Sequence, residues 1–298
     1  MDSSLLELLS GLIDYAGLFP PAALDMATAT RRYAEYRDGE YRWALGRFVV
    51  PVARLDEFEV AAERILPNEG NDAWRLTALG GADLSSDLNR IAEFNQKRAG
   101  AAVIDAIEIK VTRTAEIEAA MKLAPLELAP YFELPIKDDP SGLADLIRSV
   151  AETEARAKVR TGGVTADAFP PSSNLAGFIK ICAEEEVPFK ATAGLHHPLR
   201  SVNRMTYAPD SASTMMHGFL NVFLAAAFAQ NGMEADRLVE LLEEKSYEAF
   251  QFDSGGVMWR DEMIVRGQLR NSRKLLAIAF GSCSFEEPIE DLKKAGLL

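Results

Sequence analysis

The chain has 298 residues, of which 48% are hydrophobic and 26% charged, a composition typical of a globular protein with a large core. Its formal net charge of −13 argues against a nucleic acid or an anionic membrane surface as a general partner. No apolar run approaches the ~20 residues that a membrane-spanning helix needs, and residues 1–17 lack the basic start of a signal peptide. We therefore expect a cytoplasmic protein.

Segments of β-rich composition alternate with segments of helical composition along the chain. Strands are predicted, in chain order, at 12–17, 43–51, 74–81, 105–112, 128–136, 157–164, 187–195 and 247–259. A longer loop, 196–214, and a helix, 215–232, separate the last two of these strands. Because that helix is apolar nearly all round, we expect it deep inside the protein. A final helix is predicted at 266–281 and a short tail helix at 286–298.

Eight strand–helix units in a chain of this length predict a (β/α)8 barrel, a TIM barrel, formed as a single domain by residues 1–298. A doubly wound open sheet is the alternative. The chain has no convincing GxGxxG sequence at the start of a helix, which disfavours a dinucleotide-binding fold. It also lacks a GxxxxGK[ST] loop, a CxxC pair and an HExxH motif.

Polar side chains near the carboxyl ends of the predicted strands are the candidate site residues, since TIM barrels carry their active sites at that end. Residues two apart on a strand share a face, which pairs Glu108 with Lys110 and Lys158 with Arg160. The whole set is Arg47, Glu108, Lys110, Tyr131, Glu133, Lys158, Arg160, Lys190, Thr192, His196, His197, Gln251 and Asp253.

This set carries more basic than acidic side chains, although the chain as a whole is acidic. The contrast predicts a small anionic substrate, a carboxylate or a phosphate ester. The alternative is that some of these residues face the helices or form a structural salt network. That alternative is harder to hold for the whole set, because buried strand positions seldom carry charge without a partner or a role.

All three histidines follow the seventh predicted strand, at His196, His197 and His217. Adjacent histidines on a loop are a weak metal signal, and an ion would need a further ligand such as Glu133 or Asp253. We expect no cofactor, with a divalent metal on Glu133, His196 and His197 left open. The two cysteines, Cys182 and Cys283, lack metal-ligand spacing, and we expect both to be inert thiols.

The sequences K-V-R-T-G-G at Lys158 and K-A-T-A-G-L at Lys190 resemble the sixth and seventh strands of class I aldolase barrels, above all the deoxyribose-phosphate aldolase type. The resemblance implies that Lys158 forms a Schiff base and that Lys190 tunes its pKa and helps to move protons. It also implies an acidic partner on an earlier strand, which would be Glu108 or Glu133. The seventh-strand motif continues here into His-His-Pro, where the family has a glycine-rich phosphate loop.

The leading hypothesis is thus a Schiff-base aldolase or lyase that acts on a small anionic carbonyl compound. Lys158 is the expected nucleophile, Lys190 its partner and Glu133 or Glu108 the general acid/base. The expected substrate-binding residues are Arg160, Arg47, Lys110, Tyr131, Thr192, His196, His197 and Asp253. A metal-dependent lyase or hydrolase on the same rim is one alternative, and a barrel without catalysis that binds an anion or a partner protein is another. Homodimer formation is left open.

Overall fold

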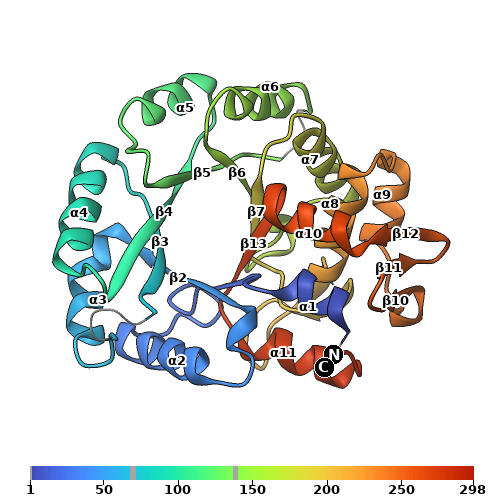
Figure 1. Cartoon of the computed structure of the whole chain (residues 1–298), viewed down its shortest axis with the longest axis horizontal. Coiled ribbons are helices and arrows are strands. Elements are labelled where there is room, and N and C mark those ends of the chain that lie inside the picture. The colour runs from blue at the N-terminus through green and yellow to red at the C-terminus, as the bar shows by residue number, and fades with distance from the viewer. Residues whose placement is uncertain (1, 68–71, 137–139) are drawn as a thin grey trace.

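The computed structural model describes residues 2–67, 72–136 and 140–298. At its centre is a closed barrel of parallel strands surrounded by helices, as Figure 1 shows. The strands of the barrel are β1 (Ile13–Tyr15), β2 (Leu45–Pro51), β3 (Trp74–Leu79), β4 (Ala102–Lys110), β5 (Ala129–Glu133), β6 (Arg156–Arg160), β7 (Phe189–Thr192) and β13 (Ala277–Ser282). Around the barrel their order is β1-β13-β7-β6-β5-β4-β3-β2, and the predicted (β/α)8 barrel is confirmed.

Helices cover the outside of the barrel (Figure 1). They are α1 (Ser3–Leu9), α2 (Met26–Asp38), α3 (Leu55–Ala62), α4 (Leu84–Lys97), α5 (Thr114–Met121), α6 (Pro140–Ala151), α7 (Ser172–Glu184), α8 (Phe219–Gln230), α9 (Ala235–Leu242), α10 (Arg266–Leu275) and α11 (Glu286–Lys294). Two of them begin at aspartates whose side chains accept a backbone N–H of the first turn, Asp25 for α2 and Asp83 for α4. Among the described residues, no helix is both long enough and apolar enough to cross a membrane.

The predicted position of the eighth barrel strand is wrong. The barrel closes through β13, which lies within the predicted final helix 266–281 and is buried along nearly all its length. A short apolar run such as Ala277–Ser282 has no periodicity that distinguishes a buried strand from the end of a helix. The segment 247–259 instead forms β10 (Phe250–Phe252) and β11 (Gly256–Trp259), which pair with β12 (Glu262–Val265) in a separate antiparallel sheet.

The long segment after β7 also contains a hairpin that the sequence did not predict. Strands β8 (Ser201–Arg204) and β9 (Ser213–Met216) pair antiparallel, and β9 extends from the predicted loop into the first two residues of the predicted helix 215–232. The apolar helix that follows, α8, is buried over nearly all its residues, as predicted. It packs on the barrel wall, where the rings of Phe219 and Phe223 lie 5.2 and 5.9 Å from the ring of Phe280 on β13.

The carboxyl ends of β6 and β7 are joined closely by residues of the two lysine motifs. Thr161 donates its hydroxyl to the carbonyl oxygen of Ala193 at 2.6 Å. Gly194 has a φ of +75°, and a Cβ there would lie only 3.0 Å from the Cα of Gly162. Glycine is therefore required at this close approach. These motif residues hold the two strand ends together and so fix the positions of the lysines that precede them.

Candidate functional site

Five charged side chains from five different strands meet inside the barrel. Asp14 on β1, Lys190 on β7, Glu108 on β4, Lys158 on β6 and Glu133 on β5 alternate in sign. The Nζ atom of Lys190 lies 2.6 Å from Asp14 Oδ2 and 2.6 Å from Glu108 Oε1. The Nζ atom of Lys158 lies 2.5 Å from Glu108 Oε2 and 2.7 Å from Glu133 Oε2. We call these five residues the charge chain.

The register of the barrel explains this meeting. Lys158 stands opposite Lys190 on the neighbouring strand, and Glu133 stands opposite Lys158. Inward-facing positions of adjacent strands fall at the same depth, so their side chains share the interior. The predicted lysine pair therefore does face inward.

Alternating sign makes this buried arrangement tolerable, because an unpaired buried charge is strongly unfavourable. Burial alone would raise the pKa of Glu108, but the ammonium groups of Lys158 and Lys190 outweigh it and lower that pKa to about 2. Burial alone would lower the pKa of Lys190, yet the carboxylates of Asp14 and Glu108 raise it above its ordinary value. The carboxylate of Glu108 bridges the two lysines, whose ammonium groups would otherwise repel one another directly.

Asp14 is the member of the charge chain that the sequence analysis missed. Its Oδ1 atom accepts the backbone N–H of Arg47 at 2.7 Å, while its Oδ2 atom accepts from Lys190. A Cβ on Gly46 would overlap Oδ1, so a glycine on β2 makes room for the carboxylate. An acidic residue inside the apolar segment 12–17 was the available signal.

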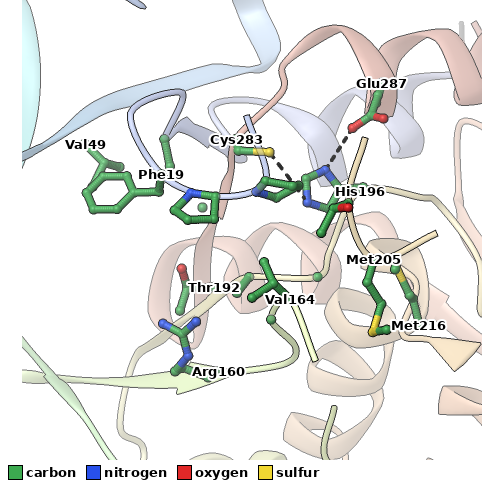
Figure 2. Close-up of a pocket in the computed structure, with 18 of the residues that line it drawn as sticks. Phe19, Val49, Arg160, Val164, Thr192, His196, Met205, Met216, Cys283 and Glu287 are labelled. Carbon is green, nitrogen blue, oxygen red and sulfur yellow. Dashed lines mark hydrogen bonds and ion pairs between the residues drawn. The ribbon is translucent and has the colours of Figure 1, made fainter. Parts of the chain in front are cut away.

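A cavity of about 320 Å³ opens at the carboxyl end of the barrel, and it distinguishes the two lysines. Lys158 and Glu108 line it, whereas Lys190 does not and is only 1% exposed. Apolar side chains form much of the remaining wall: Phe19, Val49, Leu79, Val164, Met205 and Met216. Figure 2 shows several of these residues around the cavity. A small molecule in the cavity would thus meet Lys158, while Lys190 stays beneath.

Basic and polar side chains line the outer part of the same cavity. Arg160 and Thr192, the last residues of β6 and β7, do so together with His197, and Arg204 joins them from the β8–β9 hairpin. Arg160 is half exposed, and its guanidinium group lies 4.0 Å from Glu133 Oε2. For Arg204, no ion pair occurs among the described residues. These two guanidinium groups are available to an anionic ligand.

His196 lines the cavity as the centre of a second polar cluster. Its Nδ1 atom lies 3.0 Å from Glu287 Oε2 on α11, and its Nε2 atom lies 3.9 Å from the Sγ atom of Cys283, which follows β13. Figure 2 shows the imidazole between these two partners. Tyr207, from the segment between β8 and β9, donates its hydroxyl to Glu287 Oε2 at 2.9 Å. Cys283 and Glu287 were missed because the eighth strand was placed too early.

Two predicted site residues lie elsewhere, and both predictions need correction. Arg47 lies near the amino end of β2 and pairs with Asp105, at 2.6 Å, beside a different cavity. Asp253 lies in the turn between β10 and β11, where its Oδ1 atom accepts the N–H groups of Gly255 and Gly256. Asp253 was assigned to the site only because 247–259 was taken for a barrel strand. Gln251, on β10, shares that error.

Two further predicted residues lie next to the main cavity without lining it. Lys110 is exposed at the end of β4 and, together with Glu133 and Arg160, lines a neighbouring cavity. Tyr131 is buried below the lysines, with its ring centroid 5.5 Å from Lys190 Nζ and its hydroxyl accepting from Arg156. Tyr131 therefore packs against the charge chain and is not placed to contact a ligand.

The three residues predicted as possible metal ligands each contact a different side chain. Glu133 pairs with Lys158, His196 with Glu287, and His197 with Asp291 at 2.6 Å. Across residues 2–67, 72–136 and 140–298, no group of three or more His, Cys, Asp or Glu side chains is arranged to hold a metal ion. His217 lies apart from the cavity, where its Nε2 atom contacts the carbonyl oxygen of Pro170 at 2.8 Å.

In comparisons with known proteins, no protein-family model matches the chain, and no curated protein is significantly similar to it.

Proposed function

We propose that this protein is a Schiff-base lyase of the aldolase type, acting on a small anionic carbonyl compound. The observation that carries the proposal is the position of Lys158. It is a primary amine at the floor of a cavity at the catalytic end of a TIM barrel, held between the carboxylates of Glu108 and Glu133. The resemblance of the Lys158 and Lys190 motifs to class I aldolases points to the same chemistry.

In the proposed reaction Lys158 first gives up a proton, and its neutral amine attacks the carbonyl carbon of the substrate. Glu133 is the proposed proton acceptor, since its carboxylate contacts Nζ at 2.7 Å and lies nearer to solvent than Glu108. Loss of one water from the carbinolamine gives a protonated imine. That cation withdraws electrons from the neighbouring carbon, which permits loss of an α-proton or cleavage of a carbon–carbon bond.

The rest of the charge chain stabilises the cationic imine. Glu108 stays ionised because Lys190 lies 2.6 Å from it, and its low pKa keeps a negative charge beside the imine nitrogen. Asp14 in turn holds Lys190 protonated. Lys190 is thus proposed as a positioning residue for Glu108 and not as the nucleophile.

The substrate's anionic group is proposed to contact Arg160, with Arg204 on the same cavity. A guanidinium group binds a carboxylate or phosphate with two parallel hydrogen bonds. The cavity of about 320 Å³ limits the substrate to a small molecule.

The test is exchange of substrate α-protons with D₂O, followed by NMR for a panel of small keto acids, aldehydes and phosphorylated ketones. Enamine formation on Lys158 predicts exchange of at least one compound by the wild-type protein and none by Lys158→Ala. Lys110→Ala is the matched control, because Lys110 ends β4, which β5 separates from β6, and does not line the main cavity. Exchange that persists in Lys158→Ala would overturn the proposal, as would no exchange with any compound.

A further inference from the structure

The cluster of His196, Cys283, Glu287 and Tyr207 has no role in the imine chemistry, although it lines the same cavity as Lys158. Four separate segments supply it: His196 follows β7, Tyr207 lies between β8 and β9, Cys283 follows β13, and Glu287 lies in the first turn of α11. A structural network needs no thiol on the cavity wall. The cluster therefore requires its own explanation.

The imidazole of His196 connects a thiol to a carboxylate. Its Nε2 atom is 3.9 Å from Cys283 Sγ, and its Nδ1 atom is 3.0 Å from Glu287 Oε2 (Figure 2). A nucleophile, a base and a group that orients the base stand in this order in enzymes that use an activated side-chain nucleophile. Tyr207 keeps Glu287 in place through its hydrogen bond and lies 3.6 Å from the sulfur.

The charges around His196 support the same arrangement. Burial alone would lower the pKa of His196, but its contacts with Cys283 and Glu287 raise it to about 9. The other groups that face it are the Ser282 hydroxyl and the His197 ring. A histidine in contact with a cysteine provides a group to which the thiol proton can pass as the sulfur attacks.

The second cysteine of the chain provides a contrast. Cys182 lies on α7 and is completely buried, and burial raises the pKa of its thiol well above the ordinary value. No cavity described here is lined by it. The expectation of an inert thiol fits Cys182 and does not fit the surroundings of Cys283.

We propose that Cys283 is a nucleophile for the carbonyl carbon of a small anionic aldehyde, with His196 as its proton carrier and Glu287 as a positioning residue. The inference shares the anionic carbonyl ligand of the proposed function, since Arg160 and Arg204 line the same cavity, but it does not require an imine on Lys158.

The step needs no further reactant. A carbon–sulfur bond forms between Sγ and the carbonyl carbon, and the carbon–oxygen π bond breaks to leave an alkoxide. The proton of the thiol passes through His196 Nε2 to that oxygen. The product is a hemithioacetal, and reversal of the same steps releases the aldehyde. If the proposed lyase reaction also takes place, the hemithioacetal on Cys283 would hold an aldehyde fragment in the same cavity as the substrate carbon that is bound to Lys158.

The first measurement is the rate of alkylation of each cysteine at neutral pH by iodoacetate and iodoacetamide, read by peptide mass mapping. Cys283 should react and Cys182 should not. His196→Gln should slow the alkylation of Cys283 roughly tenfold or more. Arg160→Gln should slow iodoacetate more than iodoacetamide, because only iodoacetate carries a carboxylate. A Cys283 rate that His196→Gln leaves unchanged would overturn the proposal.

The second measurement uses glyoxylate and glyceraldehyde 3-phosphate labelled with ¹³C at the aldehyde carbon. The proposal predicts a hemithioacetal signal in the wild-type protein that disappears in Cys283→Ser. An adduct that persists in Lys158→Ala and is lost in Cys283→Ser supports the thiol even if the imine proposal fails. An adduct lost only in Lys158→Ala, or no adduct with either aldehyde, contradicts it. Circular dichroism and thermal unfolding of Cys283→Ser exclude loss of the fold as the cause.

Discussion

The barrel carries two ionic networks whose difference bears on function. Near the amino ends of the strands, Arg47 and Arg75 both bind Asp105. Towards the carboxyl ends, the charge chain links two lysines with three carboxylates. Arginine keeps its charge at any ordinary pH, whereas lysine can give up its proton and become a nucleophile. The first network contains no side chain that becomes a neutral amine, whereas the second contains the groups that the proposed chemistry needs.

The two networks also line different cavities, since Arg47 and Arg75 line one near the amino ends of the strands. Lys158 lines the cavity at the carboxyl end, and its partners beneath, Lys190 and Asp14, are almost fully buried. The charge chain thus joins a reactive group on the cavity wall to a fixed support that is buried beneath it.

Lys158→Ala should have the largest effect on activity. Removal of the nucleophile should reduce α-proton exchange roughly 10³-fold or more. Arg47→Gln, which perturbs the network at the amino ends, should leave the exchange rate within about twofold. Both rates would be measured by NMR with the best substrate of the panel. Equal losses in the two variants would remove the functional distinction between the networks.

Lys190→Met should have the largest effect on stability. It leaves Asp14 and Glu108 buried without their shared cation, which should cost about 3–5 kcal/mol of the free energy of unfolding. Arg47→Gln should cost less, about 1–2 kcal/mol, because Asp105 keeps its contact with Arg75. Urea unfolding at neutral pH measures both. If Lys190→Met lost less free energy of unfolding than Arg47→Gln, the charge chain would not be the more stabilising of the two networks.

Acid should weaken the charge chain through Glu108. Its pKa is about 2 in the folded protein against 4.5 ordinarily, so its ionised form contributes about 3 kcal/mol that is present above pH 4.5 and lost as the pH falls towards 2. Glu108→Gln should remove this part of the acid dependence in urea unfolding measured across that range. Glu57→Gln is the control, since Glu57 pairs with Arg54 on the surface. An unchanged acid limb in Glu108→Gln would contradict the assignment.

Arg160→Gln should change substrate affinity more than turnover. Loss of the guanidinium group should raise KM roughly tenfold or more, with kcat changed much less, because the group contacts the anion and not the reacting carbon. A substrate analogue without the anionic group should show the same KM in both proteins. A large fall in kcat at unchanged KM would place Arg160 in the chemical step instead.

Asp253→Ala should have the smallest effect. The carboxylate only orders the turn between β10 and β11, so activity should match that of the wild type and the melting temperature should fall slightly. Kinetic assay and thermal unfolding together check this. A clear loss of activity would mean that the segment 247–259 contributes to the site after all.

The sequence was sufficient to predict the barrel and the inward face of the lysine strands, because period-two spacing and the strand–helix rhythm are local patterns. Lys158, Glu108 and Glu133 were all identified in this way. The link between Lys190 and Asp14 was not predicted, since it joins residues 176 positions apart in the chain. Only the closure of the barrel brings β1 beside β13 and across from β7.

The eighth strand shows what local patterns cannot decide. Ala277–Ser282 is apolar on both sides and directly follows a helix, so composition alone favours continuing that helix. This one error displaced the site prediction to Asp253 and left Cys283 unexplained. The missed site residues, Asp14, Cys283 and Glu287, contact partners that lie far from them in the sequence.

Borohydride trapping with the panel of carbonyl compounds, followed by peptide mass mapping, decides whether Lys158 forms an imine. Reduction converts an imine into a stable amine and so marks the lysine that formed it. We predict a reduced adduct on Lys158, which lines the cavity, and none on Lys190, which lies beneath it. An adduct on Lys190, or none on either lysine with any compound, would contradict this prediction.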